Sequence, residues 1–178
     1  MKIRPKDMAL VALLAGCTAV GAFFRFPLGP APISLQTFFT LVAGCLLGAR
    51  LGALSQALYI FTGLMGVPVF TSGAGPSYIL SPTFGFLLGF VLCAWTVGKY
   101  MERRPPVMKN FLVATFAGSL FIYLLGIPWL YLILTRISGV EMTFWGAFKV
   151  GCLVFLPGDG LKIVAVSWLA SRIVPRLN

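Results

Sequence analysis

The chain alternates between long apolar stretches and short interruptions made of charged residues, prolines and glycines. These interruptions divide it into six apolar segments, at residues 8–24, 35–49, 51–65, 78–98, 111–134 and 157–174. Several segments are shorter than the ~20 residues that a simple membrane-crossing helix needs. Short crossings suit a protein whose loops dip into the membrane over a cavity, because irregular backbone at that depth must be buried or line such a cavity. The pattern predicts an all-α membrane protein with six transmembrane helices.

Composition supports the membrane assignment. Of the 178 residues, 59% are hydrophobic and only 10% are charged, and the mean hydropathy is +0.97. In a soluble domain about a quarter of all residues are charged, because its surface faces water. We therefore expect an integral membrane protein in the lipid bilayer, organised as one domain over residues 1–178. No cleavable signal peptide is expected, since the first apolar segment continues without a polar cleavage region and more segments follow.

The net charge of +10 first suggests nucleic acid as a partner. The basic residues, however, bracket the apolar segments and form no stripe with interleaved aromatics, which argues against nucleic-acid binding. If six segments alternate across the membrane, ten of the 14 Lys and Arg residues fall on one side: Lys2, Arg4, Lys6, Arg50, Lys99, Arg103, Arg104, Lys109, Arg172 and Arg176. Arg25 and Arg136 fall on the other side. Because cytoplasmic loops are enriched in Lys and Arg, both termini are predicted to be cytoplasmic.

Three connections then lie outside, at residues 25–36, 66–83 and 136–149. The first two are rich in Pro and Gly, nearly uncharged and apolar, so we expect them to fold back over a cavity as a lid. The third is expected to contain a short interfacial helix anchored by Phe144 and Trp145. There is no histidine, and the four cysteines are far apart without ligand spacing, so no metal or other cofactor is expected.

The stretch VFLPGDGLKIVAV at 154–166 carries the most informative polar residues. Pro157 suits the first turn of a helix, which places Asp159 in that turn and Lys162 three residues further along the same face. One reading is a helix cap paired with a lysine. The other is a ligand site, because ionisable residues inside membranes are costly and usually mark a substrate path. An acid beside a base suits a ligand that has N–H donors and an anionic group.

Other polar and aromatic residues near the outer ends of the segments are candidates for the same cavity: Ser34, Gln36, Thr37, Phe70, Tyr78, Ser81 and Thr83. Gln36 alternatively marks a polar boundary, and Tyr78 alternatively anchors the chain at the membrane interface. Phe70 is proposed to close over an apolar ring of the ligand.

The first segment has small residues at helical spacing, namely Ala9, Ala12, Gly16 and Ala19, with Ala15 alongside. Such a stripe allows close approach of another helix, either within the bundle or from a partner. A partner is of interest because the chain has no G-x-x-x-x-G-K-[ST] loop and so cannot hydrolyse a nucleotide by that mechanism. Driven uptake would need another subunit.

Several blocks in fixed order resemble the BioY family, the biotin-specific S components of energy-coupling factor (ECF) transporters. They are FPLGPAPISLQT (26–37), LLGARLGALSQALYIFTGLMGVPVF (46–70), SPTFGFLLGF (81–90) and FLPGDGLK (155–162). The resemblance implies a six-helix subunit that binds biotin from outside and associates with a transmembrane coupling protein and two ATPases. It also implies that Asp159 and Lys162 belong to the ligand site and that region 66–77, with Gly73, contributes to its lid. The coupling surface would lie at Ala12, Ala15, Gly16 and Ala19.

Biotin offers two ureido N–H donors, a carbonyl acceptor, an apolar sulfur ring and a carboxylate tail. We hypothesise that Asp159 accepts a ureido N–H, while Lys162 donates to the ureido oxygen or to the tail carboxylate. The alternatives are an S component for another small vitamin and a self-sufficient secondary carrier. An enzyme is not expected, because no catalytic constellation is present.

Overall fold

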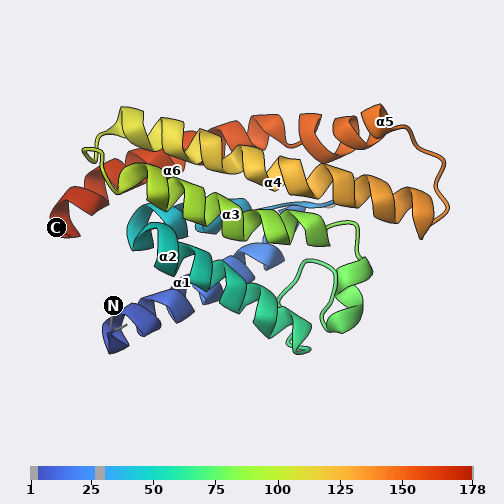
Figure 1. Ribbon diagram of the computed structural model, residues 1–178, viewed down its shortest axis with the longest axis horizontal. Helices are drawn as coiled ribbons and strands as arrows, with labels where there is room; N and C mark the ends of the chain where they lie inside the picture. The colour runs from blue at the N-terminus through green and yellow to red at the C-terminus, as the bar shows by residue number, and fades with distance from the viewer. Residues whose placement is uncertain (1–3, 27–30, 178) are drawn as a thin grey trace.

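The computed structural model describes residues 4–26 and 31–177, and most of them are helical (Figure 1). The long helices are α1 Pro5–Phe23, α2 Gln36–Leu64, α3 Phe84–Met101, α4 Met108–Arg136 and α6 Leu156–Leu177. The short elements are β1 Arg25–Phe26, β2 Ile33–Ser34, the 3-10 turn η1 Pro76–Leu80, α5 Phe144–Phe148 and the π-helical turn η2 Lys149–Leu153. The predicted all-α fold class is confirmed, and the only sheet in these ranges is the two-residue antiparallel pair β1–β2.

Helix α2 reverses direction at Gly48. This glycine has a φ of 75°, a left-handed conformation that interrupts the helix. The Thr40 hydroxyl donates to Gln56 Oε1 at 3.1 Å, although sixteen residues of straight helix would separate the two by ~24 Å. The apolar segments predicted at 35–49 and 51–65 are therefore the two antiparallel limbs of α2.

The end of α3 packs against this reversal. A Cβ added to Gly98 would lie 2.1 Å from the backbone nitrogen of Ala49, so the two backbones are in direct contact. Both chain termini and the α3–α4 connection lie at this same end of the molecule (Figure 1).

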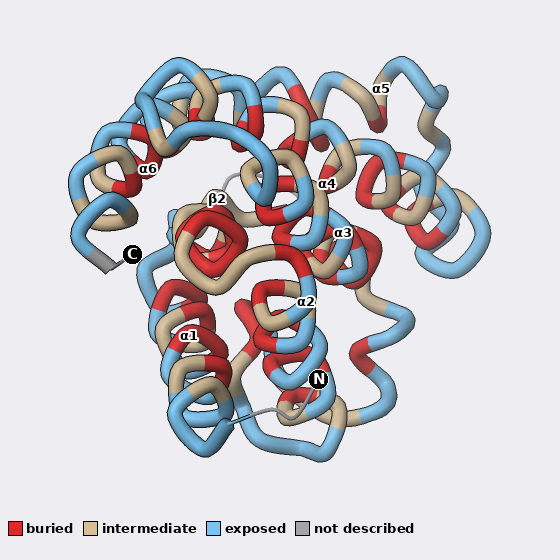
Figure 2. Tube along the Cα trace, turned by 60° about the vertical axis from the view of Figure 1, so that its left-hand side comes forward, coloured by how far each residue is buried: buried red, intermediate tan, exposed pale blue. Residues whose placement is uncertain are grey.

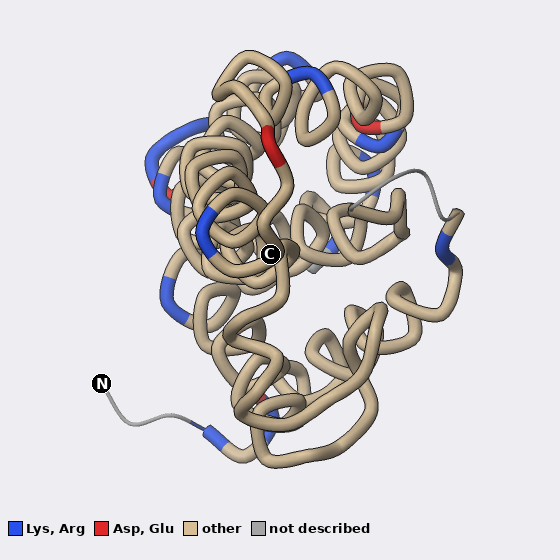
Figure 3. The backbone as a smooth tube through the Cα atoms, turned by 90° about the vertical axis from the view of Figure 1, so that its right-hand side faces the viewer, with Lys and Arg blue, Asp and Glu red and all other residues tan. Residues whose placement is uncertain are grey.

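By length and composition, helices α1 to α4 each hold enough apolar residues to cross a membrane, although in α2 these residues are divided between its two limbs. The segments Phe144–Leu153 and Leu156–Arg176, which meet at 41°, form a fifth if they act as one span. Charged residues are sparse along the chain, as the mostly tan tube of Figure 3 shows. The six membrane crossings and the cytoplasmic location of both termini remain predictions.

Glycines bring α3 close to its neighbours. A Cβ on Gly89 would lie 2.6 Å from the Cα of Ile122 in α4, and one on Gly44 would lie 2.8 Å from Val97 in α3. The largest fully buried side chains include Tyr59, Phe111 and Leu41. The buried stretches gather where α1, α2, α3 and α4 face one another (Figure 2). This packing holds the walls of the cavity described below.

A buried polar cluster joins α1 to both limbs of α2. Gln56 donates to the Thr18 hydroxyl at 3.2 Å and accepts from the Thr40 hydroxyl at 3.1 Å, and all three residues are fully buried. Among apolar helices such bonds stabilise association, because the polar groups have no water to bind instead.

The start of one expected segment differs from the structure. The segment expected at 78–98 begins as η1, and α3 starts only at Phe84. Ser81 and Thr83 lie between the two elements and bond locally: their hydroxyl oxygens are 2.9 Å apart, and Thr83 N donates to Ser81 Oγ at 3.4 Å. Within 136–149 a short helix, α5, is present as expected, with Phe144 and Trp145 exposed.

Candidate functional site

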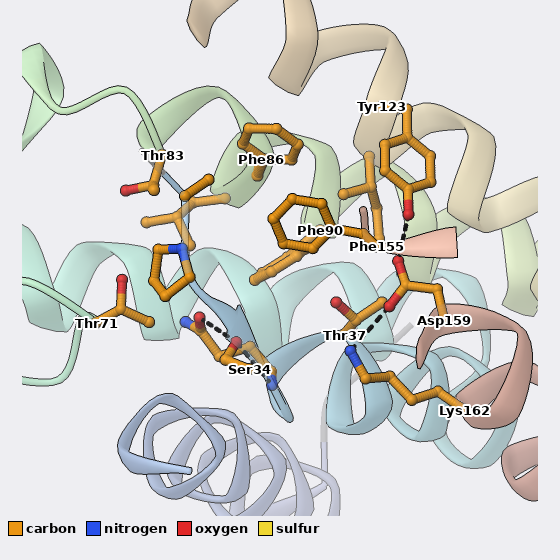
Figure 4. Close-up of a pocket in the computed structure, with 15 residues that line it drawn as sticks. Ser34, Thr37, Thr71, Thr83, Phe86, Phe90, Tyr123, Phe155, Asp159 and Lys162 are labelled. Carbon is orange, nitrogen blue, oxygen red and sulfur yellow. Dashed lines mark hydrogen bonds and ion pairs between the residues drawn. The ribbon is translucent and has the colours of Figure 1, made fainter. Parts of the chain in front are cut away.

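A cavity lies between β2, the start of α2, and helices α3, α4 and α6 (Figure 4). It encloses about 520 Å³ free of protein atoms, counting its open mouth. The lining residues are Ala31, Pro32, Ser34, Gln36, Thr37, Thr71, Thr83, Phe86, Leu87, Phe90, Ile122, Tyr123, Phe155, Asp159 and Lys162.

Asp159 and Lys162 line the cavity together. Asp159 lies in the first turn of α6, where its backbone N–H donates to the carbonyl of Phe155 at 2.9 Å. Lys162 Nζ donates to Asp159 Oδ1 at 2.8 Å, and the two side chains are 10% and 9% exposed. The two residues thus form an ion pair and also line the cavity, and their role at a ligand stays a prediction.

Tyr123 of α4 completes this group. Its hydroxyl donates to Asp159 Oδ2, so both carboxylate oxygens have a protein donor. The sequence reasoning did not select Tyr123. A signal existed, because Tyr123 falls near the middle of an apolar helix, whereas tyrosines of membrane helices favour the interfaces.

Aromatic and aliphatic side chains form the middle of the cavity. Phe86, Leu87 and Phe90 come from α3, and Phe155 precedes α6. The rings of Phe86 and Phe155 stack with centroids 6.4 Å apart. This part of the wall offers dispersion contacts to an apolar ring.

Hydroxyl and amide groups form a second polar region. Thr71 and Thr83 lie on the opposite side of the phenyl rings from Asp159 in the view of Figure 4. Ser34 Oγ donates to Gln36 Oε1 at 2.9 Å, and the Gln36 amide donates to the hydroxyl of Tyr59. The predicted candidates Ser34, Gln36 and Thr83 therefore meet Asp159 and Lys162 around one cavity.

Tyr78, Phe70 and Gly73 do not line it. Tyr78 instead contacts two residues that line the cavity: its hydroxyl bonds Thr83 Oγ1 at 2.8 Å and Thr71 Oγ1 at 3.2 Å.

Phe70 is buried because its ring lies flat against Gly63: a Cβ on Gly63 would be 2.1 Å from Phe70 Cζ. Its ring also contacts Tyr59 at 5.5 Å between centroids. Gly73 is exposed in the loop that follows, with a φ of 133°. The described 66–77 segment therefore reaches the cavity through Thr71, and roles for Phe70, Tyr78 and Gly73 at the ligand stay predictions.

The first connection folds back as expected. Strand β2 pairs with β1, and the Leu35 N–H donates to the carbonyl of Gly21 at 3.1 Å. Ala31, 3% exposed, and Pro32 then reach the cavity wall. Residues 27–30 of this connection lie outside the described part.

The small residues of α1 divide between two faces. Ala12 and Gly16 are exposed, and nothing lies within 4 Å of a Cβ placed on Gly16. Ala15 is buried in the core, and Ala19 is intermediate. Ala12 and Gly16 are thus available to a partner helix, whereas Ala15 serves internal packing.

Among the described residues no cluster of His, Cys, Asp or Glu is arranged to hold a metal ion. The four cysteines are all free, and Cys45, Cys93 and Cys152 are buried.

The sequence profile of the BioY family matches residues 1–178. A protein of Lysinibacillus sphaericus named probable biotin transporter BioY is 41% identical over 94% of this chain and 86% of its own length. The biotin transporter BioY of Thermotoga maritima is 32% identical over 94% of this chain and 95% of its own. Both similarities span nearly the whole chain.

Solved structures share the fold. The crystal structure of the S-component for biotin from an ECF-type ABC transporter matches with a TM-score of 0.81 at 23% identity, over 96% of this chain and 91% of that one. The structure of FolT bound with folic acid matches with a TM-score of 0.70 at 18% identity, over 96% and 95%. At these identities the similarity establishes the fold alone.

Proposed function

The chain belongs to the BioY family, and we propose that it is the biotin-binding membrane subunit of an ATP-driven uptake transporter. Its relatives are transporters, so its role is transport and not catalysis. Several apolar helices make it a multi-pass protein of the prokaryotic cell membrane. Residues 1–178 act as one S-component domain that captures biotin on the outer side.

The buried ion pair on the cavity wall is the observation that carries this proposal. Each oxygen of Asp159 has one protein donor and therefore a lone pair left for a ligand N–H. Lys162 has three N–H donors and one recorded partner in the described chain. A ligand with both N–H donors and strong acceptors fits this pair, and biotin supplies both through its ureido ring and its carboxylate.

The remainder of the cavity suits the other parts of biotin. Phe86, Phe90 and Phe155 pack around the apolar sulfur ring and keep water from the polar contacts. The hydroxyls of Ser34, Thr71 and Thr83 offer hydrogen bonds at a distance from the ion pair. Buried polar groups that match a ligand reject analogues lacking the partner group.

A titration of the purified full-length protein tests this. Biotin, measured by calorimetry on protein from biotin-depleted cells, should bind tightly, and thiamine and riboflavin should not compete. Asp159→Asn should lower the affinity at least tenfold, because a hydrogen bond to a charged group is replaced by a neutral one. Glu141→Gln makes the same chemical change at an exposed residue and should bind like the parent. Unchanged affinity in Asp159→Asn would exclude that residue from the site.

Lys162 meets either the ureido oxygen or the tail carboxylate. Biotinamide, which has no carboxylate, separates the two. If Lys162→Met weakens biotin and biotinamide equally, the lysine contacts the ureido oxygen. If it weakens biotin alone, the lysine contacts the tail.

Energy for uptake comes from partners. The sequence lacks a P-loop, and the exposed Ala12 and Gly16 provide a surface on α1 for a transmembrane coupling protein that also binds two ATPases. Proteoliposomes that hold the chain alone should not accumulate biotin, whereas those that also hold the coupling protein and ATPases should do so with ATP. Accumulation by the chain alone under an ion gradient would identify a secondary carrier instead.

A further inference from the structure

The Asp159 carboxylate is held from two different helices. Lys162 lies three residues further along α6, so it moves together with Asp159. Tyr123 comes from α4 and is the described residue that ties the carboxylate to a second helix. Its hydroxyl therefore fixes the position of Asp159 relative to the rest of the cavity wall.

The contact between Tyr123 and Asp159 follows from the register in which α4 packs against α6. The hydroxyls of Thr115 and Ser167 are 3.1 Å apart, and both residues are fully buried. Thr115 precedes Tyr123 by eight residues, and Ser167 follows Asp159 by eight residues. In an antiparallel helix pair, equal displacements in opposite directions preserve the register. The two side-chain contacts thus mark one continuous interface.

The backbone beside Tyr123 is also fixed by α3. Ile122, its neighbour, approaches Gly89 so closely that an added Cβ would lie 2.6 Å from the Ile122 Cα. On the next turn, a Cβ on Gly126 would lie 2.3 Å from the ring of Phe86, which lines the cavity. Interiors packed this closely leave little room for a helix to shift. The close packing of α4 against α3 therefore fixes the position of the Tyr123 hydroxyl beside Asp159.

We propose that Tyr123 is a positioning residue for ligand recognition: it holds the Asp159 carboxylate in the orientation that receives the ligand's N–H groups. This inference rests on the proposed function. The terminal torsion of an aspartate is broad, so a carboxylate held only by Lys162 samples more orientations and loses that freedom on binding. Pre-orienting it in the free protein reduces this cost and tightens binding.

Tyr123→Phe removes the hydroxyl and keeps the ring. Tyr131→Phe is the matched control, because Tyr131 lies on the same helix, two turns further on, and outside the lining of this cavity. Infrared spectra of the ligand-free protein report the carboxylate directly. With only four acidic residues in the chain, the Asp159 band is identified by its loss in Asp159→Asn. Biotin titrations of the same samples give the affinity.

In Tyr123→Phe the Asp159 carboxylate band should shift in the absence of ligand, and the affinity for biotin should fall about tenfold, as expected for a lost hydrogen bond to a charged group. Tyr131→Phe should leave both unchanged. An unshifted band in Tyr123→Phe would show that the tyrosine does not hold the carboxylate, whether or not the protein binds biotin. A shifted band with unchanged affinity would refute the role in recognition. Failure of the parent protein to bind biotin would instead refute the proposed function.

Discussion

Thr115 and Ser167 share a hydrogen bond of 3.1 Å between two side chains with no exposed surface. This bond and the contact of Tyr123 with Asp159 lie eight residues apart on each helix. One contact stabilises the pair of helices, while the other faces the cavity. Their effects on stability and on binding can therefore be measured separately.

Thr115→Val should lower the free energy of unfolding by about 1 kcal/mol, because the Ser167 hydroxyl loses its partner in an apolar setting. The Thr115→Val/Ser167→Ala double variant should lose less than the sum of the two single changes. Unfolding in mixed micelles measures both. Thr135→Val is the control on the same helix, because among the described residues its hydroxyl bonds just the carbonyl of Tyr131, one turn back in α4. An equal loss in Thr135→Val would contradict the special role of the Thr115–Ser167 pair.

Asp159→Asn should destabilise the protein by about 3–5 kcal/mol, because it leaves the buried ammonium of Lys162 without its counter-charge. Adding Lys162→Met should recover much of that stability, since no uncompensated charge then remains. Neither variant should regain the parent affinity for biotin. Parallel unfolding and calorimetric measurements check this. A double variant as unstable as the single one would show that the pair carries no buried-charge penalty.

Gly98→Ala should destabilise the protein by about 2 kcal/mol or more, because the added methyl would meet the backbone of Ala49 at 2.1 Å. Gly16→Ala is the contrasting change in another helix, where nothing lies within 4 Å of the new atom. It should leave the melting temperature unchanged or raise it, because alanine favours helix more than glycine does. Melting curves of the purified parent and variants measure both effects. A melting temperature of Gly98→Ala equal to that of the parent would disprove the close contact.

Gly16→Leu should leave the affinity for biotin within about twofold of the parent, because Gly16 is exposed and outside the cavity lining. It should reduce copurification with the coupling protein, because a large side chain prevents close helix approach. Val113→Phe enlarges an exposed residue on α4 and serves as control. Copurification of Gly16→Leu at the parent level would remove this face of α1 from the coupling surface.

The apolar pattern locates most helices to within a few residues, because bilayer burial selects long hydrophobic runs. The reversal in α2 is different. Arg50 and neighbouring glycines divide the pattern into two segments, but the sequence does not reveal that helical structure resumes after one left-handed residue, Gly48. That continuity depends on the close contact with Gly98, which is a tertiary property.

The site was predictable where its residues contrast with their surroundings. Asp159 and Lys162 stand out among apolar neighbours, so the sequence alone selects them. Tyr123 and Phe90 do not, since aromatic residues are common in membrane helices, and only the register of α4 against α6 brings Tyr123 to Asp159. The burial of Phe70 likewise depends on the bare surface of Gly63, which no local pattern shows.

The reversal at Gly48 has a consequence for how the protein is made. At 1.5 Å per residue, the limbs at 36–47 and 49–64 measure about 18 Å and 24 Å, less than the ~30 Å hydrocarbon core of a bilayer. Neither limb is a complete stop-transfer segment by itself. We therefore expect the insertion machinery to release them as one hairpin, with Thr40 and Gln56 already paired when the chain leaves the translocon.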